Sequence, residues 1–218
     1  DDFLTIVFEA PDDESAEEIS TDTAAGFCAV LSLLTTAPCR FEFVQALEGD
    51  ARRRVPTLHS VSLGRFHMYN LDSLRERLST VPAISSLIDD SRLRPALIYF
   101  QKGLFLRDLF GDPKVERYPH YLGGSAIAQE GFLNFWKSIA VILGETKEGK
   151  RFQTFYRKLG YSAEDFAGTI RPVYDVRDRY NIAHSSLDPS KEFIDINQVA
   201  LCLNLAKEVI ERYISFLE

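Results

Sequence analysis

A short segment near the end of the chain, residues 173–186, contains residue types that can act on a phosphodiester. Arg177 and His184 are seven residues apart, so on an α-helix they lie two turns from one another and within about 20° of the same direction. Tyr180 and Asn181 flank the same face, whereas Arg179 points about 140° away from His184. An Arg side chain binds two phosphate oxygens at once, and a His changes protonation near neutral pH. The segment therefore predicts a helical face that binds a phosphate and moves a proton.

The helices that must position this face are expected in the second half of the chain. From about residue 91, apolar residues recur at three- and four-residue spacing, which is typical of helices packed on a core. Ser91 is expected to cap the first helix, Gly144 to end the second, and Ser162 to Asp165 to form a capping box for the third. The third helix is expected to reach His184, with a kink at Pro172. The expected helices are residues 91–109, 125–143, 162–184 and 199–217, and the expected core aromatics are Tyr99, Phe132, Phe135 and Trp136.

The first half of the chain has a more mixed pattern, which predicts a small α+β module over residues 1–88 beside a helical bundle over residues 89–218. The acidic stretch 12–22 is interpreted as a solvated loop, and Asp22 as the cap of a helix over residues 24–34. The expected strands are residues 3–8, 41–44 and 55–63, the last two separated by a turn at Gly49-Asp50 and by the basic triplet Arg52-Arg53-Arg54. The fold class is therefore mainly α, with a C-terminal bundle of four helices.

An Arg and a His separated by a few residues near the end of the third helix of such a bundle resemble the motif of the HEPN superfamily (higher eukaryotes and prokaryotes nucleotide-binding). Here the motif is Arg177, six residues and His184, and the polar Asp178 directly follows the Arg. The resemblance covers roughly residues 91–218. The chain is also faintly similar to HEPN-like proteins that are encoded with methylamine-utilisation enzymes.

The resemblance implies a metal-independent endoribonuclease of the kind found in toxin and antiviral-defence systems. In such an enzyme the ribose 2′-hydroxyl attacks the adjacent phosphorus, His184 acts as general base or acid, and Arg177 stabilises the transition-state charge. Asp178, Tyr180 and Asn181 are the candidate substrate-binding residues. The resemblance further implies a homodimer with RNA or a nucleotide as ligand, and no cofactor or metal. The alternative is a non-catalytic HEPN-like module that binds a nucleotide or a protein.

Structural explanations remain open for several of these residues. Arg177 can pair with Asp178 or with a carboxylate of a neighbouring helix, and His184 can interact with the helix dipole. The basic triplet at residues 52–54 is either a phosphate-contacting patch or, more simply, a solvated loop. The basic and aromatic residues between Lys147 and Lys158 suit single-stranded RNA, but they also have the spacing of an ordinary buried helix face.

Composition sets the wider limits. The formal charge of −7 argues against a protein that coats nucleic acid, but nine acidic side chains lie in residues 1–22, where there is no Lys or Arg. Residues 91–218 hold 18 basic and 16 acidic side chains, so an RNA site there depends on a local group of cations. Three cysteines without a C-x-x-C pair predict neither a disulfide framework nor a zinc site, and no apolar run approaches the roughly 20 residues needed to span a bilayer. The expectation is a reduced, cytoplasmic protein.

Overall fold

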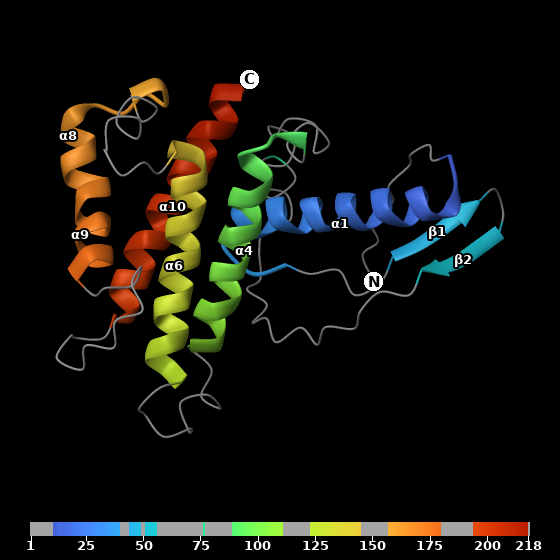
Figure 1. Ribbon diagram of the computed structural model, residues 1–218, viewed down its shortest axis with the longest axis horizontal. Helices are drawn as coiled ribbons and strands as arrows, with labels where there is room; N and C mark the ends of the chain where they lie inside the picture. The colour runs from blue at the N-terminus through green and yellow to red at the C-terminus, as the bar shows by residue number, and fades with distance from the viewer. Residues whose placement is uncertain are drawn as a thin grey trace.

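The structure is a computed structural model that describes residues 11–39, 44–48, 51–55, 76, 89–110, 123–144, 157–179 and 194–217. Helices predominate in this part of the chain (Figure 1), so the prediction of a mainly helical fold is confirmed. The elements are α1 (Asp13–Thr35), β1 (Val44–Glu48), β2 (Ala51–Val55), α4 (Leu93–Phe110), α6 (Gly123–Leu143), α8 (Ala163–Asp165), the π-helix η1 (Phe166–Ile170), α9 (Arg171–Arg179) and α10 (Ile196–Leu217).

A single hydrophobic core joins α4, α6, α9 and α10. Helix α6 lies between α9 and α4, with α10 behind it in the view of Figure 1. Phe100 of α4 and Phe135 of α6 meet edge to face, with their ring centroids 5.5 Å apart. Large buried rings of this kind dominate the hydrophobic stabilisation of a core. Phe132, Phe135 and Trp136 are buried as predicted, whereas Tyr99 is only half-buried.

Helix α1 begins earlier than the sequence predicts. Asp12 is its N-cap, and the Asp12 carboxylate accepts a hydrogen bond of 2.7 Å from the Ser15 amide. The prediction of a solvated loop over residues 12–22 is therefore wrong from Asp13 onward. A good cap and acidic side chains in the first turn stabilise a helix even without an apolar stripe. Asp22 lies within α1 rather than capping it. Its carboxylate makes a 2.7 Å ion pair with Arg94 of α4.

The C-terminal half of α1 belongs to the same core as the later helices. Ala29, Val30, Leu33 and Leu34 are all buried in that core. Residues 77–88, which contain the predicted boundary between residues 1–88 and 89–218, lie outside the described residues. The division into two domains therefore stays a prediction, although α1 itself packs on the bundle.

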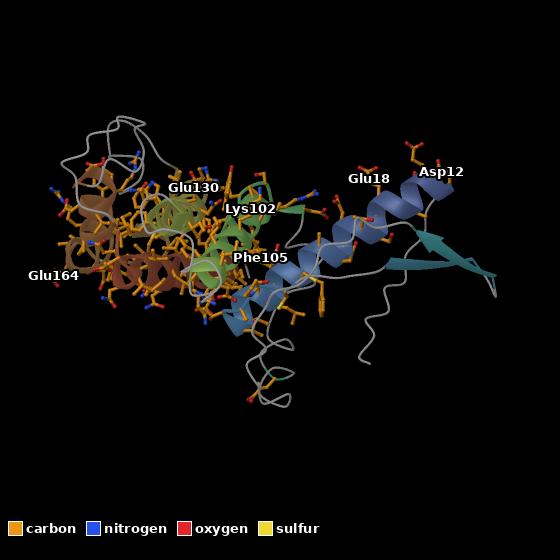
Figure 2. All side chains as sticks on the ribbon, turned by 90° about the horizontal axis from the view of Figure 1, so that it is seen from below. Asp12, Glu18, Lys102, Phe105, Glu130 and Glu164 are labelled. Carbon is orange, nitrogen blue, oxygen red and sulfur yellow. The ribbon has the colours of Figure 1, made fainter. Side chains whose placement is uncertain are left out.

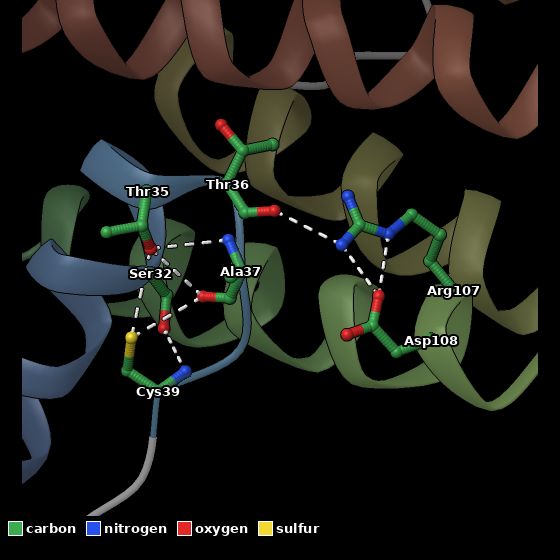
Figure 3. A network of polar contacts seen from close by, with 7 residues as sticks. All are labelled: Ser32, Thr35, Thr36, Ala37, Cys39, Arg107 and Asp108. Atoms are coloured by element: carbon green, nitrogen blue, oxygen red, sulfur yellow. Dashed lines mark hydrogen bonds and ion pairs between the residues drawn. The ribbon is translucent and has the colours of Figure 1, made fainter. Parts of the chain in front are cut away.

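A polar network at the end of α1 fixes this helix to its neighbours (Figure 3). Thr36, the C-cap, has the left-handed backbone conformation with φ 54° and ψ 31°, which non-glycine residues rarely adopt. The Arg107 guanidinium of α4 donates to the Thr36 carbonyl at 3.1 Å and also pairs with Asp108 at 2.6 Å. The Lys207 ammonium of α10 donates to the Thr36 hydroxyl at 2.8 Å. Contacts from two helices thus hold the turn in a costly conformation.

The two described strands form an antiparallel hairpin in which Val44 pairs with Val55 and Glu48 with Ala51. Residues 49–50, where the sequence predicts a turn, lie outside the described residues, and Arg52-Arg53-Arg54 lie within β2 rather than in the expected loop. Paired backbone groups in a two-stranded ribbon tolerate long polar side chains, because both faces need not be buried. The strand expected over residues 3–8 lies outside the described residues, as do residues 41–43 and 56–63.

Helix ends in the bundle follow local hydrogen bonds closely. Asp90, not Ser91, caps α4, because its carboxylate accepts from the amides of Arg92 and Leu93 at 2.9 and 2.7 Å. A single oxygen of Asp90, Oδ1, accepts from both free amides, which the Ser91 hydroxyl cannot do from its place one residue later. Gly144 ends α6 with φ 75°, as predicted.

The predicted apolar stripe of the last helix is confirmed over most of α10. Val199, Cys202, Ala206 and Tyr213 are among its buried residues, but Leu217 is 42% exposed at the helix end. An unpredicted capping box opens α10, since Asp195 and Gln198 each accept from the other's backbone amide at 2.9 Å. None of the helices that the structure describes is long and apolar enough to cross a lipid bilayer.

Candidate functional site

The helix that carries Arg177 consists of three consecutive parts: α8, η1 and α9. It opens with the predicted capping box, in which the Ser162 amide donates to the Asp165 carboxylate at 2.8 Å and the Asp165 amide donates to the Ser162 hydroxyl at 3.0 Å. The π-helical turn Phe166–Ile170 ends two residues before Pro172. A proline ring clashes with the carbonyl four residues earlier, so a wider turn at this point relieves the clash where the sequence predicts a kink.

Arg177 lies on the side of α9 that packs against the bundle. Ile170 and Val173 are fully buried, and Val176 is partly buried against the same core. Arg177 is seven residues after Ile170 and four after Val173, so its side chain starts from the same inward direction. The Arg177 side chain is half-buried, and its Nε atom is fully buried.

The Arg177 guanidinium packs against two aromatic rings. Its central carbon lies 5.3 Å from the ring centroid of Trp136 on α6 and 5.6 Å from that of Tyr174 on α9. The two rings meet edge to face, with centroids 5.7 Å apart and planes at 68°. Trp136 is only 2% exposed, whereas Tyr174 is 39% exposed. Arg177, Trp136 and Tyr174, hereafter the Arg177 cluster, thus connect the surface of α9 to the buried interior of α6.

The chemistry of the Arg177 cluster follows from its partial burial. A cation over an aromatic face is stabilised by about 0.5–1 kcal/mol at an exposed site and by about 2 kcal/mol when desolvated. An Arg stays charged in any protein environment, so burial orders this cation rather than neutralising it. An oriented, partly desolvated guanidinium interacts more strongly with a phosphate oxygen than a fully hydrated one.

Three other charged side chains of α9 that the structure describes are exposed. Arg171 and Asp175 form an exposed 3.0 Å ion pair one turn apart, and Asp178 is exposed. An exposed pair of this type contributes little to stability. Asp178 therefore stands next to the cluster in sequence but is turned to solvent.

Only part of the predicted site falls within the described residues. Arg177 and Asp178 are described, whereas Tyr180, Asn181 and His184 lie outside. The proximity of Arg177 and His184 therefore stays a prediction. The contact with Trp136 shows that Arg177 packs against its own bundle.

Sequence reasoning did not connect Trp136 with the site. It assigned Trp136 to the core, which is confirmed, but a contact between residues 41 positions apart leaves no local signal. The sequence does place Tyr174 beside Arg177, because it precedes Arg177 by three residues and so shares its helix face.

Two other sequence candidates have only limited structural descriptions. Arg157 and Lys158 are exposed, and the rest of the basic and aromatic group, residues 147–156, lies outside the described part. Among the described residues, no group of three or more His, Cys, Asp and Glu side chains comes together to hold a metal ion.

Comparisons with protein-family models, with curated proteins and with solved structures found no match to this chain.

Proposed function

We propose that this chain is a metal-independent endoribonuclease of HEPN type, with Arg177 and His184 as its catalytic residues. The observation that supports the proposal is the Arg177 cluster. In this cluster a permanently charged Arg packs against the buried ring of Trp136 and the partly exposed ring of Tyr174. The proposal also draws on the spacing of Arg177 and His184, on the position of Arg177 in the third helical segment of the bundle, and on the resemblance stated above.

In the proposed reaction the ribose 2′-oxygen forms a bond to phosphorus and the bond from phosphorus to the 5′-oxygen breaks. The proton of the 2′-hydroxyl passes to a general base, and the leaving 5′-oxygen takes a proton from a general acid. His184 fills one of these two roles. The Arg177 guanidinium binds the non-bridging oxygens, whose negative charge grows in the pentavalent transition state. The products are a 2′,3′-cyclic phosphate and a 5′-hydroxyl.

The Arg177 cluster supports this role for Arg177 through preorganisation. An Arg side chain loses much conformational freedom when it binds a ligand, and packing against Trp136 and Tyr174 reduces that cost before the ligand arrives. Tyr174, which is 39% exposed, also offers aromatic surface beside the cation, to which a ribose or base can pack.

The proposal includes a homodimer in which two such sites line one cleft, as the resemblance implies. It also includes a role as an effector in toxin or antiviral-defence systems. Asp178, Tyr180 and Asn181 are proposed to contact the substrate, and Asp178 is the one among them whose exposure the structure describes.

A second function is favoured by one specific observation. Arg177 packs against Trp136 within its own bundle, and such a contact also suits a non-catalytic module that binds a nucleotide or a protein. In that case the Arg177 cluster binds a phosphate group of the ligand, and no covalent bond is broken.

Cleavage of RNA in EDTA by Arg177 and His184 variants separates the two functions. We expect Arg177→Ala and His184→Ala each to abolish cleavage, and Arg177→Lys to retain a small part of it, since Lys supplies charge without the two-pronged geometry. Arg171→Ala is the matched control, because it removes an exposed Arg of the same helix. Helicity measured by circular dichroism must stay unchanged in all variants. Cleavage that persists in the Arg177→Ala/His184→Ala double variant would refute the ribonuclease proposal.

A further inference from the structure

A second group of cations and apolar side chains lies where α4 and α6 meet, away from the Arg177 cluster on α9. Tyr99 of α4 is half-buried, and two ammonium groups approach its ring. Lys102 Nζ lies 5.9 Å and Lys137 Nζ 5.5 Å from the ring centroid. Ile98 is 40% exposed and lies one helical turn before Lys102, on the same side of α4. Ile98, Tyr99, Lys102 and Lys137 are called the α4–α6 patch below.

The two lysines of the α4–α6 patch bring like charges to a single ring. Within the described residues, neither ammonium group has a carboxylate at ion-pair distance. The neighbouring cations of α4 differ in this respect, because Arg94 pairs with Asp22 and Arg107 with Asp108. Among the described residues, the α4–α6 patch therefore carries two ammonium groups without a paired carboxylate, beside the exposed side chain of Ile98.

One acidic side chain lies on the same side of the molecule. Glu130 precedes Lys137 by seven residues, which places it on the same face of α6 and about 10.5 Å away along the helix axis. Figure 2 shows Lys102 and Glu130 projecting from the same side of the molecule. At that separation, close to the Debye length in physiological salt, Glu130 weakens the positive potential without cancelling it.

The position of the α4–α6 patch relates it to Arg177. Trp136, which receives Arg177, and Lys137, which approaches Tyr99, are consecutive residues of α6. Helix α6 lies between α9 and α4 (Figure 1). Neighbouring packed helices have axes about 8–10 Å apart, so an extended ligand that leaves Arg177 and crosses α6 reaches the patch within about 20 Å.

We propose that the α4–α6 patch binds a nucleotide of single-stranded RNA that lies outside the scissile position. The ring of Tyr99 and the side chain of Ile98 supply a surface on which a base can stack, and Lys102 and Lys137 bind the flanking phosphates. On binding, the ammonium groups exchange the weak attraction of the ring for phosphate oxygens and free the ring for the base. A duplex does not fit this chemistry, because its bases are already stacked on one another. The inference rests on the proposed function only in taking RNA as the ligand.

The test measures binding by fluorescence anisotropy with a labelled, uncleavable 2′-O-methyl single strand, so that catalysis plays no part. Tyr99→Leu is expected to weaken binding about 5- to 150-fold, the range for the loss of one stacked base. Lys102→Ala and Lys137→Ala are each expected to weaken binding several-fold and to lower the salt-dependence slope by about one. Arg94→Gln is the matched control and is expected to change affinity little, because it removes a cation of α4 that is already paired.

Unchanged affinity in Tyr99→Leu and in both lysine variants would overturn the inference. So would equal binding of a duplex of the same sequence, since it would indicate attraction to any polyanion. Patch-dependent binding by a protein that never cleaves RNA would uphold the inference and refute the proposed function. Cleavage that requires Arg177, combined with an affinity that is unchanged in the patch variants, would support the proposed function and refute the inference.

Discussion

The guanidinium of Arg177 on α9 lies 5.3 Å from the ring centroid of Trp136 on α6, so the proposed catalytic cation packs against a ring that is only 2% exposed. This contact couples the core to the site. The stability of the bundle and the orientation of Arg177 therefore both depend on the side chain of Trp136. A substitution of Trp136 should change the rate of RNA cleavage as well as the stability.

Replacement of Trp136 by Leu is expected to lower RNA cleavage strongly while the protein still folds. Leu preserves burial but removes the ring face that orients Arg177. The loss of stability should stay below the about 3–5 kcal/mol typical of truncating a buried Trp to Ala. Urea unfolding gives the stability, and cleavage in EDTA below the unfolding transition gives the activity.

Phe132→Leu is the matched control for Trp136→Leu. Phe132 is fully buried on the same helix, one turn before Trp136. The substitution therefore removes a core ring on which, in the described part of the structure, no Arg is stacked. It should cost comparable stability and preserve cleavage. Equal loss of cleavage in the two variants would mean that core stability alone, and not the contact with Arg177, governs the activity.

The close approach of α4 and α6 requires a glycine at position 103. A Cβ atom there would lie 2.6 Å from Cε1 and 2.7 Å from Cδ1 of Phe135, which is closer than carbon atoms can pack. Because the Phe135 ring is fully buried, Gly103→Ala should destabilise the fold by about 1–3 kcal/mol. Chemical denaturation measures the change.

Gly131→Ala tests the same interface from the other helix. A Cβ atom at position 131 would meet Leu106 Cβ at 3.6 Å, an ordinary contact. Alanine favours the helix by up to about 1 kcal/mol over glycine, so this variant should be neutral or stabilising. The account of the interface fails if the two variants change stability in the same direction and by the same amount.

Acidification should loosen the helix that carries Arg177. Hydrogen bonds from Ser162, chiefly from its backbone amide, hold the pKa of Asp165 below the ordinary value of 3.8. A pKa that is lower in the folded than in the unfolded state gives a stabilising contribution that is complete above the unfolded pKa and is lost as the pH falls through the folded pKa. Unfolding curves recorded from about pH 5 down to about pH 2 should therefore show a larger loss of stability in the wild type than in Asp165→Asn, which keeps the similar contribution of Asp12. Glu164→Gln, which removes the neighbouring carboxylate but no cap hydrogen bond, should follow the wild type.

The three free cysteines should react with iodoacetamide at very different rates in the folded protein. Burial, together with the neighbouring Cys39 thiol, raises the pKa of Cys28 to about 12, and complete burial raises the pKa of Cys202 as well. Since the thiolate is the reactive form, mass spectrometry should find Cys39, which is only half-buried, labelled first. In urea all three should react alike. Labelling of Cys28 as fast as Cys39 in the folded protein would contradict the packing of α1 against the core.

Local patterns predicted much of the fold. The spacing of apolar residues located α6 and α10, and the sequence from Ser162 to Asp165 predicted the capping box that the hydrogen bonds confirm. The start of α1 was missed because its first turns depend on the Asp12 cap and on charge rather than on an apolar stripe. Arg52-Arg53-Arg54 were assigned to a loop because charged runs usually are, yet backbone pairing with β1 decides their conformation.

Only those relations of the candidate site that lie within a single helix could be predicted from the sequence. Arg177 was identified from its spacing to His184, a relation within a single segment. Its contact with Trp136 depends on how α9 packs on α6, which no local pattern encodes. The convergence of Lys102 and Lys137 on Tyr99 likewise joins two helices and appears only in three dimensions.

The products formed from RNA by the wild-type protein in EDTA test the ribonuclease proposal most directly. Two oligonucleotides of identical sequence are compared, one of RNA and one of DNA, and the fragments are identified by mass spectrometry. The proposal predicts cleavage of the RNA alone, with 2′,3′-cyclic phosphate and 5′-hydroxyl ends, because the 2′-hydroxyl is the nucleophile. Intact RNA, cleavage of the DNA, or fragments ending in 3′-hydroxyl and 5′-phosphate groups would contradict it.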